Sequence, residues 1–147
     1  MKKIQTLIVA TLAATALNVH AADTPEIDSI KEVAYTCKIA IAGKQDTMPI
    51  TAMYGIKDNK IVVAQLKLNN SEITPGMWRD DFVIMNRFIS NDPEKPTTVW
   101  TAFPADANTV ATVDGGKLSV AKVAGAQQEI IAEGCKLDKA ATAKLTR

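Results

Sequence analysis

The feature that most constrains the fold is a succession of short segments in which apolar and polar residues alternate, with turn-forming residues between them. Alternation with a period of two is typical of a strand that buries one face. The expected strands are Lys31–Ala40, Met48–Ile56, Ile61–Leu68, Asp81–Ile89, Thr97–Phe103, Asn108–Val113, Lys117–Val123 and Gln127–Glu133. Roughly eight strands at this regular spacing predict an all-β chain, folded as a small antiparallel β-barrel or a sandwich.

Two connections carry residues that favour tight β-hairpins. Asp58-Asn59 separates the second and third expected strands, and Asp114-Gly115-Gly116 separates Asn108–Val113 from Lys117–Val123. Asp, Asn and Gly tolerate the positive φ angles of such turns. We expect a barrel in which the following residues are largely buried: Tyr35, Val62, Leu66, Ile84, Trp100 and Val120.

Residues 1–21 have the three-part order of a secretory signal peptide. Lys2 and Lys3 form a positive start, an apolar stretch follows, and Val19-His20-Ala21 offers small residues at both positions that a signal peptidase requires. The apolar stretch is shorter than the ~20 residues that span a bilayer, so we expect cleavage after Ala21 and no membrane span. The mature protein is then expected in the periplasm, at the outer membrane or outside the cell.

Cleavage changes both the charge and the chemistry of the chain. Without Lys2 and Lys3 there are 15 Lys and Arg residues (17 minus 2) against 16 Asp and Glu residues, so the net charge changes from +1 to −1. A near-neutral chain lacks the basic surface that binds nucleic acid. His20 is the only histidine, so the mature chain lacks the usual base of a Ser or Cys nucleophile and the usual zinc ligand. We expect no enzyme activity, no metal and no cofactor.

Cys37 and Cys135 are the only cysteines and stand near the two ends of the expected domain. In an oxidising compartment such a pair predicts a disulfide. A metal pair or a reactive thiol would need histidines or a C-x-x-C spacing, and the mature chain has neither. We therefore expect one disulfide-closed domain over residues 22–136, followed by a polar tail over residues 137–147, either helical or frayed, that only the disulfide anchors.

The most polar stretch of the expected domain runs from Ser90 to Pro96 and contains two prolines. A stiff loop loses little entropy when it docks on a partner, and functional residues concentrate on loops that a rigid scaffold carries. An ordinary hairpin connection is the alternative. The candidate partner contacts of this loop are Ser90, Asn91, Asp92 and Lys95.

A second group of candidate contacts precedes the fourth expected strand. Trp78 stands in a polar setting before Asp80 and Asp81, and exposed aromatic residues are enriched in protein interfaces. Adjacent strand residues face opposite sides, so Asp80 and Asp81 do not suit a catalytic carboxylate pair. We interpret Trp78, Asp80 and Asp81 as candidate partner-binding residues, and a solvated turn is the alternative for the two carboxylates.

Val33-Ala34-Tyr35-Thr36-Cys37 resembles the V-x-Y-x-C opening of the bacterial periplasmic inhibitors of c-type lysozyme and of the related adhesin complex protein. That group folds as a small antiparallel β-barrel with a second cysteine near its C-terminus, a position that Cys135 fits. Tyr54-Gly55 and Ile61–Leu68 resemble the second and third strands of the adhesin complex protein. The resemblance implies an exported barrel that binds and inhibits c-type lysozyme.

The inhibitors insert a Ser-Gly-x-x-Tyr loop into the lysozyme cleft, followed by a Trp-x-Lys-Gly strand. In this chain Trp100 takes the Trp position, Ala102 takes the Lys position, and no Ser-Gly pair exists. Ser90 falls near the place of the loop serine, and Lys95 is the nearest cation.

Animal lysozymes are strongly basic, so we expect four carboxylates to steer the encounter: Asp80, Asp81, Asp92 and Glu94. Two alternatives use the same barrel. It would be a surface adhesin that binds host cells, or a lipocalin-like carrier of a small apolar ligand, which requires an apolar cavity.

Overall fold

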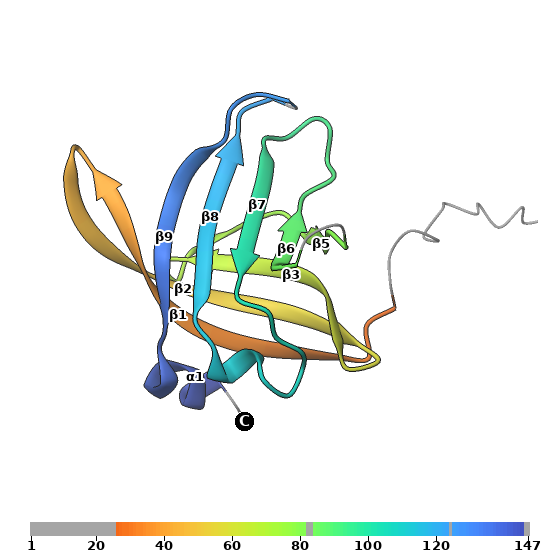
Figure 1. The fold of residues 1–147 in the computed structure, drawn as a ribbon. Coiled ribbons are helices and arrows are strands. Elements are labelled where there is room, and N and C mark those ends of the chain that lie inside the picture. Colours follow the sequence, from red (N-terminus) through yellow and green to blue (C-terminus); the bar gives the residue numbers. More distant parts are fainter. Residues whose placement is uncertain (1–25, 82–83, 124, 146–147) are drawn as a thin grey trace, which may run out of the picture.

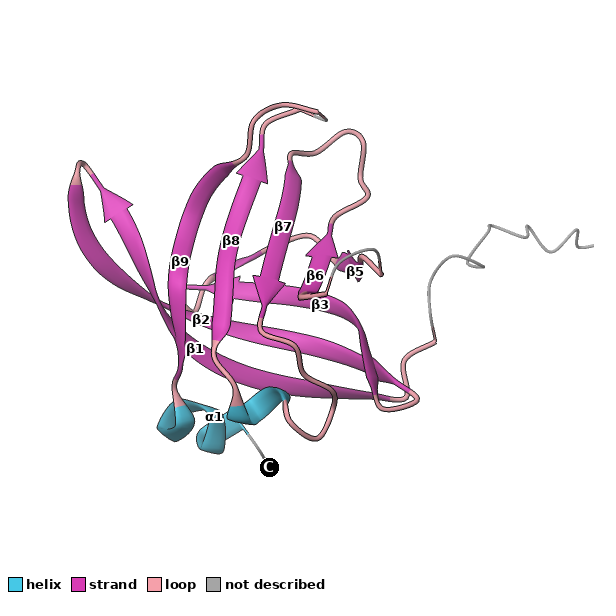
Figure 2. Cartoon of the chain, in the orientation of Figure 1, coloured by secondary structure: helices cyan, strands magenta, loops and turns pink. Residues whose placement is uncertain are grey.

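The computed structural model describes residues 26–81, 84–123 and 125–145. The predicted signal peptide and its cleavage site lie outside this part of the chain. The described residues form nine strands, a short 3-10 helix at Val110–Thr112 and a C-terminal helix (Figures 1 and 2). The elements are β1 (Ser29–Ile41), β2 (Lys44–Lys57), β3 (Lys60–Leu68), β4 (Glu72–Ile73), β5 (Met77–Arg79), β6 (Asn86–Ile89), β7 (Thr97–Ala102), β8 (Gly115–Ala121), β9 (Glu129–Leu137) and α1 (Lys139–Leu145).

Eight of these strands close an antiparallel β-barrel (Figure 1). Neighbours follow the order β2-β1-β9-β8-β7-β6-β5-β3, and the pairing of β2 with β3 completes the ring. β4 pairs with β3 outside the ring. Closure gives each strand of the ring a partner on both sides, which removes the exposed edges of an open sheet. The predicted all-β barrel is confirmed.

Aromatic side chains fill the interior of the barrel. Trp100, Tyr35, Tyr54 and Phe88 are each at most 1% exposed. Trp100 Nε1 donates a hydrogen bond to the Tyr54 hydroxyl at 2.9 Å, and the hydroxyls of Tyr54 and Tyr35 lie 3.0 Å apart. Burial raises the pKa of both phenols, that of Tyr54 to about 12. The core is therefore a packed interior in which these polar atoms have partners.

Three of the residues predicted to be buried are confirmed, namely Tyr35, Leu66 and Trp100. Val62 is only half-buried, because a β-bulge shifts the register of β3. β2 residues Gly55 and Ile56 pair with Val63 and Ile61, which leaves Val62 as the extra residue. A bulge reverses the alternation of faces, so Ile61 takes the buried position.

Two other burial predictions are wrong for reasons of topology. Ile84 is 92% exposed, because it lies outside the strands, before β6 begins at Asn86. The expected strand Asp81–Ile89 is therefore shortened to β6, and β5 was not predicted. Val120 is half-buried, because it lines a groove at the end of the barrel beside the β6–β7 loop.

The expected strand Asn108–Val113 is also wrong. The Asp106 carboxylate accepts hydrogen bonds from the backbone N–H groups of Asn108 (2.8 Å) and Thr109 (3.1 Å), which starts a turn instead of a strand. The following 3-10 helix buries Val110 at 2% exposure. Asp114-Gly115-Gly116 is consequently no hairpin turn, and β8 begins at Gly115.

The predicted disulfide is confirmed between Cys37 on β1 and Cys135 on β9. The chain after it forms α1, and Thr142 of α1 accepts a hydrogen bond from the Ala34 backbone N–H at 2.9 Å. The expectation that only the disulfide anchors this tail is therefore wrong. Within the described residues, no helix combines the length and the hydropathy that crossing a membrane requires.

β1 and β2 extend past the rest of the barrel as a two-stranded arm (Figure 1). The ladder between β1 and β9 ends at Lys38, and that between β2 and β3 begins at Ile50. A two-residue turn at Ala42-Gly43, with φ angles of 49° and 75°, closes the arm. Near its tip the Asp46 carboxylate accepts the Thr47 backbone N–H at 2.7 Å, which shields that group from pairing with another strand.

Candidate partner-binding site

The β6–β7 loop places the predicted contact residues in two different environments. Ser90 is 6% exposed and closes the hairpin. Its backbone N–H donates to the Thr98 carbonyl at 2.9 Å, and its hydroxyl accepts the Thr98 backbone N–H at 2.8 Å. Asn91, Asp92 and Lys95 are exposed. The hydroxyl of Ser90 therefore stabilises the base of the loop, and the residues after it form the accessible surface.

Asp92 organises the exposed part of this loop. Its carboxylate accepts the Glu94 backbone N–H at 3.0 Å, and its carbonyl accepts the Lys95 backbone N–H at 3.3 Å. Lys95 Nζ lies 3.6 Å from the same carboxylate. These contacts hold the turn in one shape before any partner arrives, which lowers the entropy cost of docking.

A depression of about 450 Å³ beside the loop brings four of the seven predicted residues together. Trp78, Asp80, Asp81 and Asn91 line it with Arg79 and Ile89. Trp78 lies opposite Ile89 in the β5–β6 ladder, and the two half-buried side chains provide its apolar part. We call this depression and the exposed loop residues Asn91, Asp92 and Lys95 the Trp78 face.

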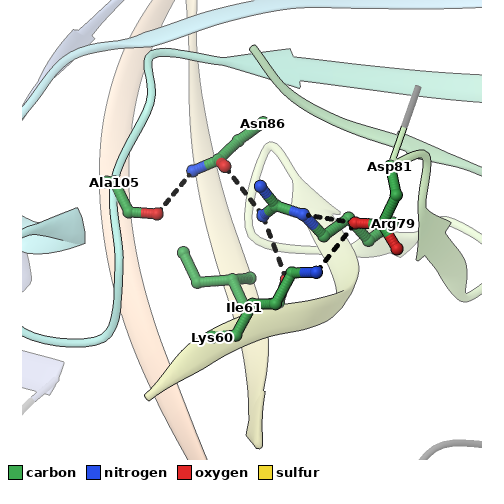
Figure 3. A network of polar contacts seen from close by, with 6 residues as sticks. All are labelled: Lys60, Ile61, Arg79, Asp81, Asn86 and Ala105. Carbon is green, nitrogen blue, oxygen red and sulfur yellow. Dashed lines mark hydrogen bonds and ion pairs between the residues drawn. The ribbon is translucent and has the colours of Figure 1, made fainter. Parts of the chain in front are cut away.

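Ion pairs neutralise both carboxylates of the depression. Arg87 donates to Asp80 at 2.6 Å. Lys60 Nζ and Arg79 Nε donate to Asp81 at 2.9 and 3.2 Å (Figure 3). The hydrogen bond from Lys60 is the main cause that lowers the pKa of Asp81. Asp80 and Asp81 therefore add little net negative potential, and the three cations exceed the two carboxylates in number.

A buried amide fixes the position of Arg79. Arg79 Nη1 donates to Asn86 Oδ1 at 2.8 Å and to the Ile61 carbonyl at 3.2 Å. Asn86 is 2% exposed, and its Nδ2 donates to the carbonyl of Ala105 at 3.0 Å (Figure 3). This network ties β5 and β6 to the segment that follows β7. Asn86 was not a candidate residue, and its only sequence signal was a lone amide at an inward position of an expected strand.

The other side of the β6–β7 loop borders an apolar groove of about 320 Å³. Lys95 and Pro96 line it, together with Leu68 and Ile73 from β3 and β4 and Ile131 from β9. Ile73 is 53% exposed. The loop therefore separates the polar depression from this groove.

Among the described residues, no group of three or more His, Cys, Asp or Glu side chains is placed to hold a metal ion. Comparison with family models, with curated proteins and with solved structures finds no match for this chain.

Proposed function

We propose that this protein is an exported partner-binding protein of the bacterial envelope that binds and inhibits c-type lysozyme through the Trp78 face. The resemblance of the segment around Tyr35 and Cys37 to the periplasmic lysozyme inhibitors supports the choice of partner. The closed barrel and the Cys37–Cys135 disulfide agree with the fold that the resemblance implies. The periplasm, the outer membrane or the exterior is the proposed location.

The preorganised loop beside an aromatic depression is the observation that carries the proposal. The Asp92 hydrogen bonds fix the loop, and Trp78 and Ile89 supply apolar area where protein interfaces concentrate their binding energy. The lysozyme cleft contains catalytic carboxylates, and Lys95 is the exposed cation of the loop. In the proposed complex, Lys95 leaves its ion pair with Asp92 and pairs with a carboxylate of the lysozyme cleft. Such an ion pair strengthens when water is excluded from it.

Three residues at positions of the family pattern have other roles in this chain. Ser90 uses its hydroxyl as the acceptor for Thr98, so we assign it to the support of the loop. Trp100 and Ala102 are at most 3% exposed, so β7 does not present a cation in place of the inhibitors' lysine. The proposed contacts are therefore Asn91, Asp92, Lys95 and Trp78, with Asp80 and Asp81 holding the rim in shape.

Titration of the purified protein against c-type lysozyme on a cell-wall substrate tests the proposal. We expect inhibition at micromolar protein, and a rise of about tenfold in the inhibition constant for Lys95→Ala or Trp78→Ala. Lys144→Ala on α1 is the control that removes an exposed charge far from the loop in sequence, and it should leave the constant unchanged. Absence of inhibition by the unmodified protein would refute the function, whereas full inhibition by Lys95→Ala and Trp78→Ala would refute the surface.

The apolar groove beside Lys95 favours a second candidate function, the binding of a small apolar ligand. Because aromatic side chains occupy the interior, such a ligand would lie in the groove of about 320 Å³ at the end of the barrel. Native mass spectrometry of protein purified from its own cells separates the two functions. A bound small molecule that Ile73→Asp abolishes would support the carrier.

A further inference from the structure

We propose that the depression of the Trp78 face is a binding site for a neutral saccharide, a ligand that combines hydroxyl groups with an apolar ring face. The depression has a volume of about 450 Å³, within the range of ~300–1,000 Å³ that is common for small-molecule sites. Trp78, Ile89 and Asn91 line it together with Arg79, Asp80 and Asp81. The inference goes beyond the proposed inhibition of lysozyme and does not depend on it.

The indole of Trp78 supplies the apolar wall of the site. Trp78 lies opposite Val63 in the β3–β5 ladder and opposite Ile89 in the β5–β6 ladder, and residues directly opposite each other share one face of a sheet. The Trp78 side chain is half-buried and lines the depression. Because the face of an indole ring carries partial negative charge, it attracts the C–H groups on the apolar face of a sugar ring.

Hydrogen-bonding groups with unused capacity stand beside this wall. Lys60 and Arg79 both donate to Oδ1 of Asp81 (Figure 3), and Oδ2 accepts no bond from the described residues. Arg79 donates through Nε and Nη1, and its Nη2 forms no bond to these residues. The side-chain amide of Asn91 is exposed and likewise has no partner in the described part of the chain. Neighbouring hydroxyl groups require this combination, since each hydroxyl both donates and accepts.

The network of Figure 3 holds these groups in place before a ligand arrives. Arg79 Nη1 donates to Asn86 Oδ1 at 2.8 Å and to the Ile61 carbonyl at 3.2 Å, and Asn86 is 2% exposed. Lys60 Nζ lies 2.9 Å from the Asp81 carboxylate. A ligand therefore meets donors and acceptors that are already oriented, which lowers the entropy cost of binding.

The charges of the depression favour a neutral ligand. An anion would approach the carboxylates of Asp80 and Asp81, and a cation would compete with the ion pairs that Arg87 and Lys60 already form with them. A wholly apolar ligand would take water from the free polar groups and leave them unpaired, which costs free energy. A ligand with hydroxyl groups pairs with these groups and leaves both ion pairs intact.

NMR titration of the ¹⁵N-labelled protein, with maltotriose and separately with chitotriose, tests the proposal. The chain contains two tryptophans. Trp100 is 0% exposed and its Nε1 donates to Tyr54, so its indole signal is an internal reference for that of Trp78. We expect at least one of the two saccharides to shift the Trp78 indole signal and the Arg79 and Asn91 amide signals, with a dissociation constant of about 1–10 mM. The Trp100 signal should not move.

Two variants test the assigned groups. Trp78→Ala and Asn91→Ala should each raise the dissociation constant about tenfold, measured on the Arg79 amide signal. Gln45→Ala removes an exposed amide from the arm and is the control that should bind as the unmodified protein does. The amide spectrum of each variant also shows whether the barrel is folded, and Asn91→Ala changes only an exposed side chain of the loop.

Three results would overturn the proposal: no shift at about 20 mM of either saccharide, the same shifts with sorbitol, which has hydroxyl groups but no ring, or binding that Trp78→Ala and Asn91→Ala both retain. Inhibition of lysozyme is measured without these saccharides. Either proposal can therefore fail while the other holds.

Discussion

Tyr54 connects the hydrogen-bonded aromatic side chains inside the barrel, since its hydroxyl contacts both Trp100 and Tyr35. We predict that Tyr54→Phe lowers the free energy of unfolding by about 1–3 kcal/mol, because it leaves the buried Trp100 N–H without an acceptor. Tyr35→Phe is the matched control. It keeps the bond from Trp100 and should cost about 1 kcal/mol. Urea unfolding measures both values, and equal costs would contradict the assigned network.

The same phenols predict how stability depends on pH. The folded pKa of Tyr54 is about 12 against an ordinary value of 10.0, because burial disfavours the charged form, and the pKa of Tyr35 is raised for the same reason. The unfolded chain therefore loses these protons first. Stability from both groups is complete below pH 10 and falls as the pH rises toward 12. Urea unfolding between these values should show a shallower fall for Tyr54→Phe than for the unmodified protein.

Ala42 has a φ angle of 49° in the turn of the arm, a region that side chains with a Cβ atom rarely adopt. We predict that Ala42→Gly raises the free energy of unfolding, by at most about 1 kcal/mol, because the strain of this angle exceeds the entropy cost of glycine. Ala40→Gly on the adjoining strand is the control and should destabilise. A loss of stability in Ala42→Gly would show that the turn has another conformation.

At the scale of elements, the start of β8 depends on a residue without a side chain. A Cβ atom at Gly115 would lie 3.0 Å from Cη2 of Trp100 and 3.1 Å from Cβ of Cys135. We predict that Gly115→Ala lowers the free energy of unfolding by about 1–3 kcal/mol through overpacking. Gly76→Ala, where a Cβ atom would meet no atom within 4 Å, is the control for the loss of glycine. Thermal unfolding of the two variants should separate them clearly.

The strands that the sequence predicted well are those whose alternation runs unbroken, such as β1 and β7. Errors arose where a contact distant in sequence decides the local structure. Val62 is only half-buried because the pairing of β3 with β2 contains a bulge at this residue. Ile84 is exposed because β6 begins only at Asn86, a boundary that alternation alone does not reveal. Asp106 did carry a local signal, since an Asp that precedes Asn and Thr favours a capped turn.

At the scale of the whole molecule, the fold brings Trp78 and Asn91 together in one depression although 12 residues separate them (91 minus 78, less one). Trp78 was a candidate because it is an aromatic residue in a polar setting, and Asn91 because it lies in a polar loop with two prolines. The ion pairing of Asp80 and Asp81 could not be predicted in this way, because Lys60 and its partner Asp81 are 21 positions apart in the sequence. In the proposed encounter with a basic partner, Glu94 is left as the main steering carboxylate, because Asp80 and Asp81 are ion-paired and Asp92 lies 3.6 Å from Lys95.

Amide hydrogen exchange of this protein, alone and saturated with c-type lysozyme, tests the central claim most directly because it reports both the partner and the surface. We predict slower exchange in residues 78–81 and 91–95, with α1 and the arm unchanged. A matched measurement with the Trp78→Ala variant should show weaker protection at the same lysozyme concentration. Unchanged exchange over the whole chain, or protection confined to segments outside the Trp78 face, would contradict the proposed binding of lysozyme by this face.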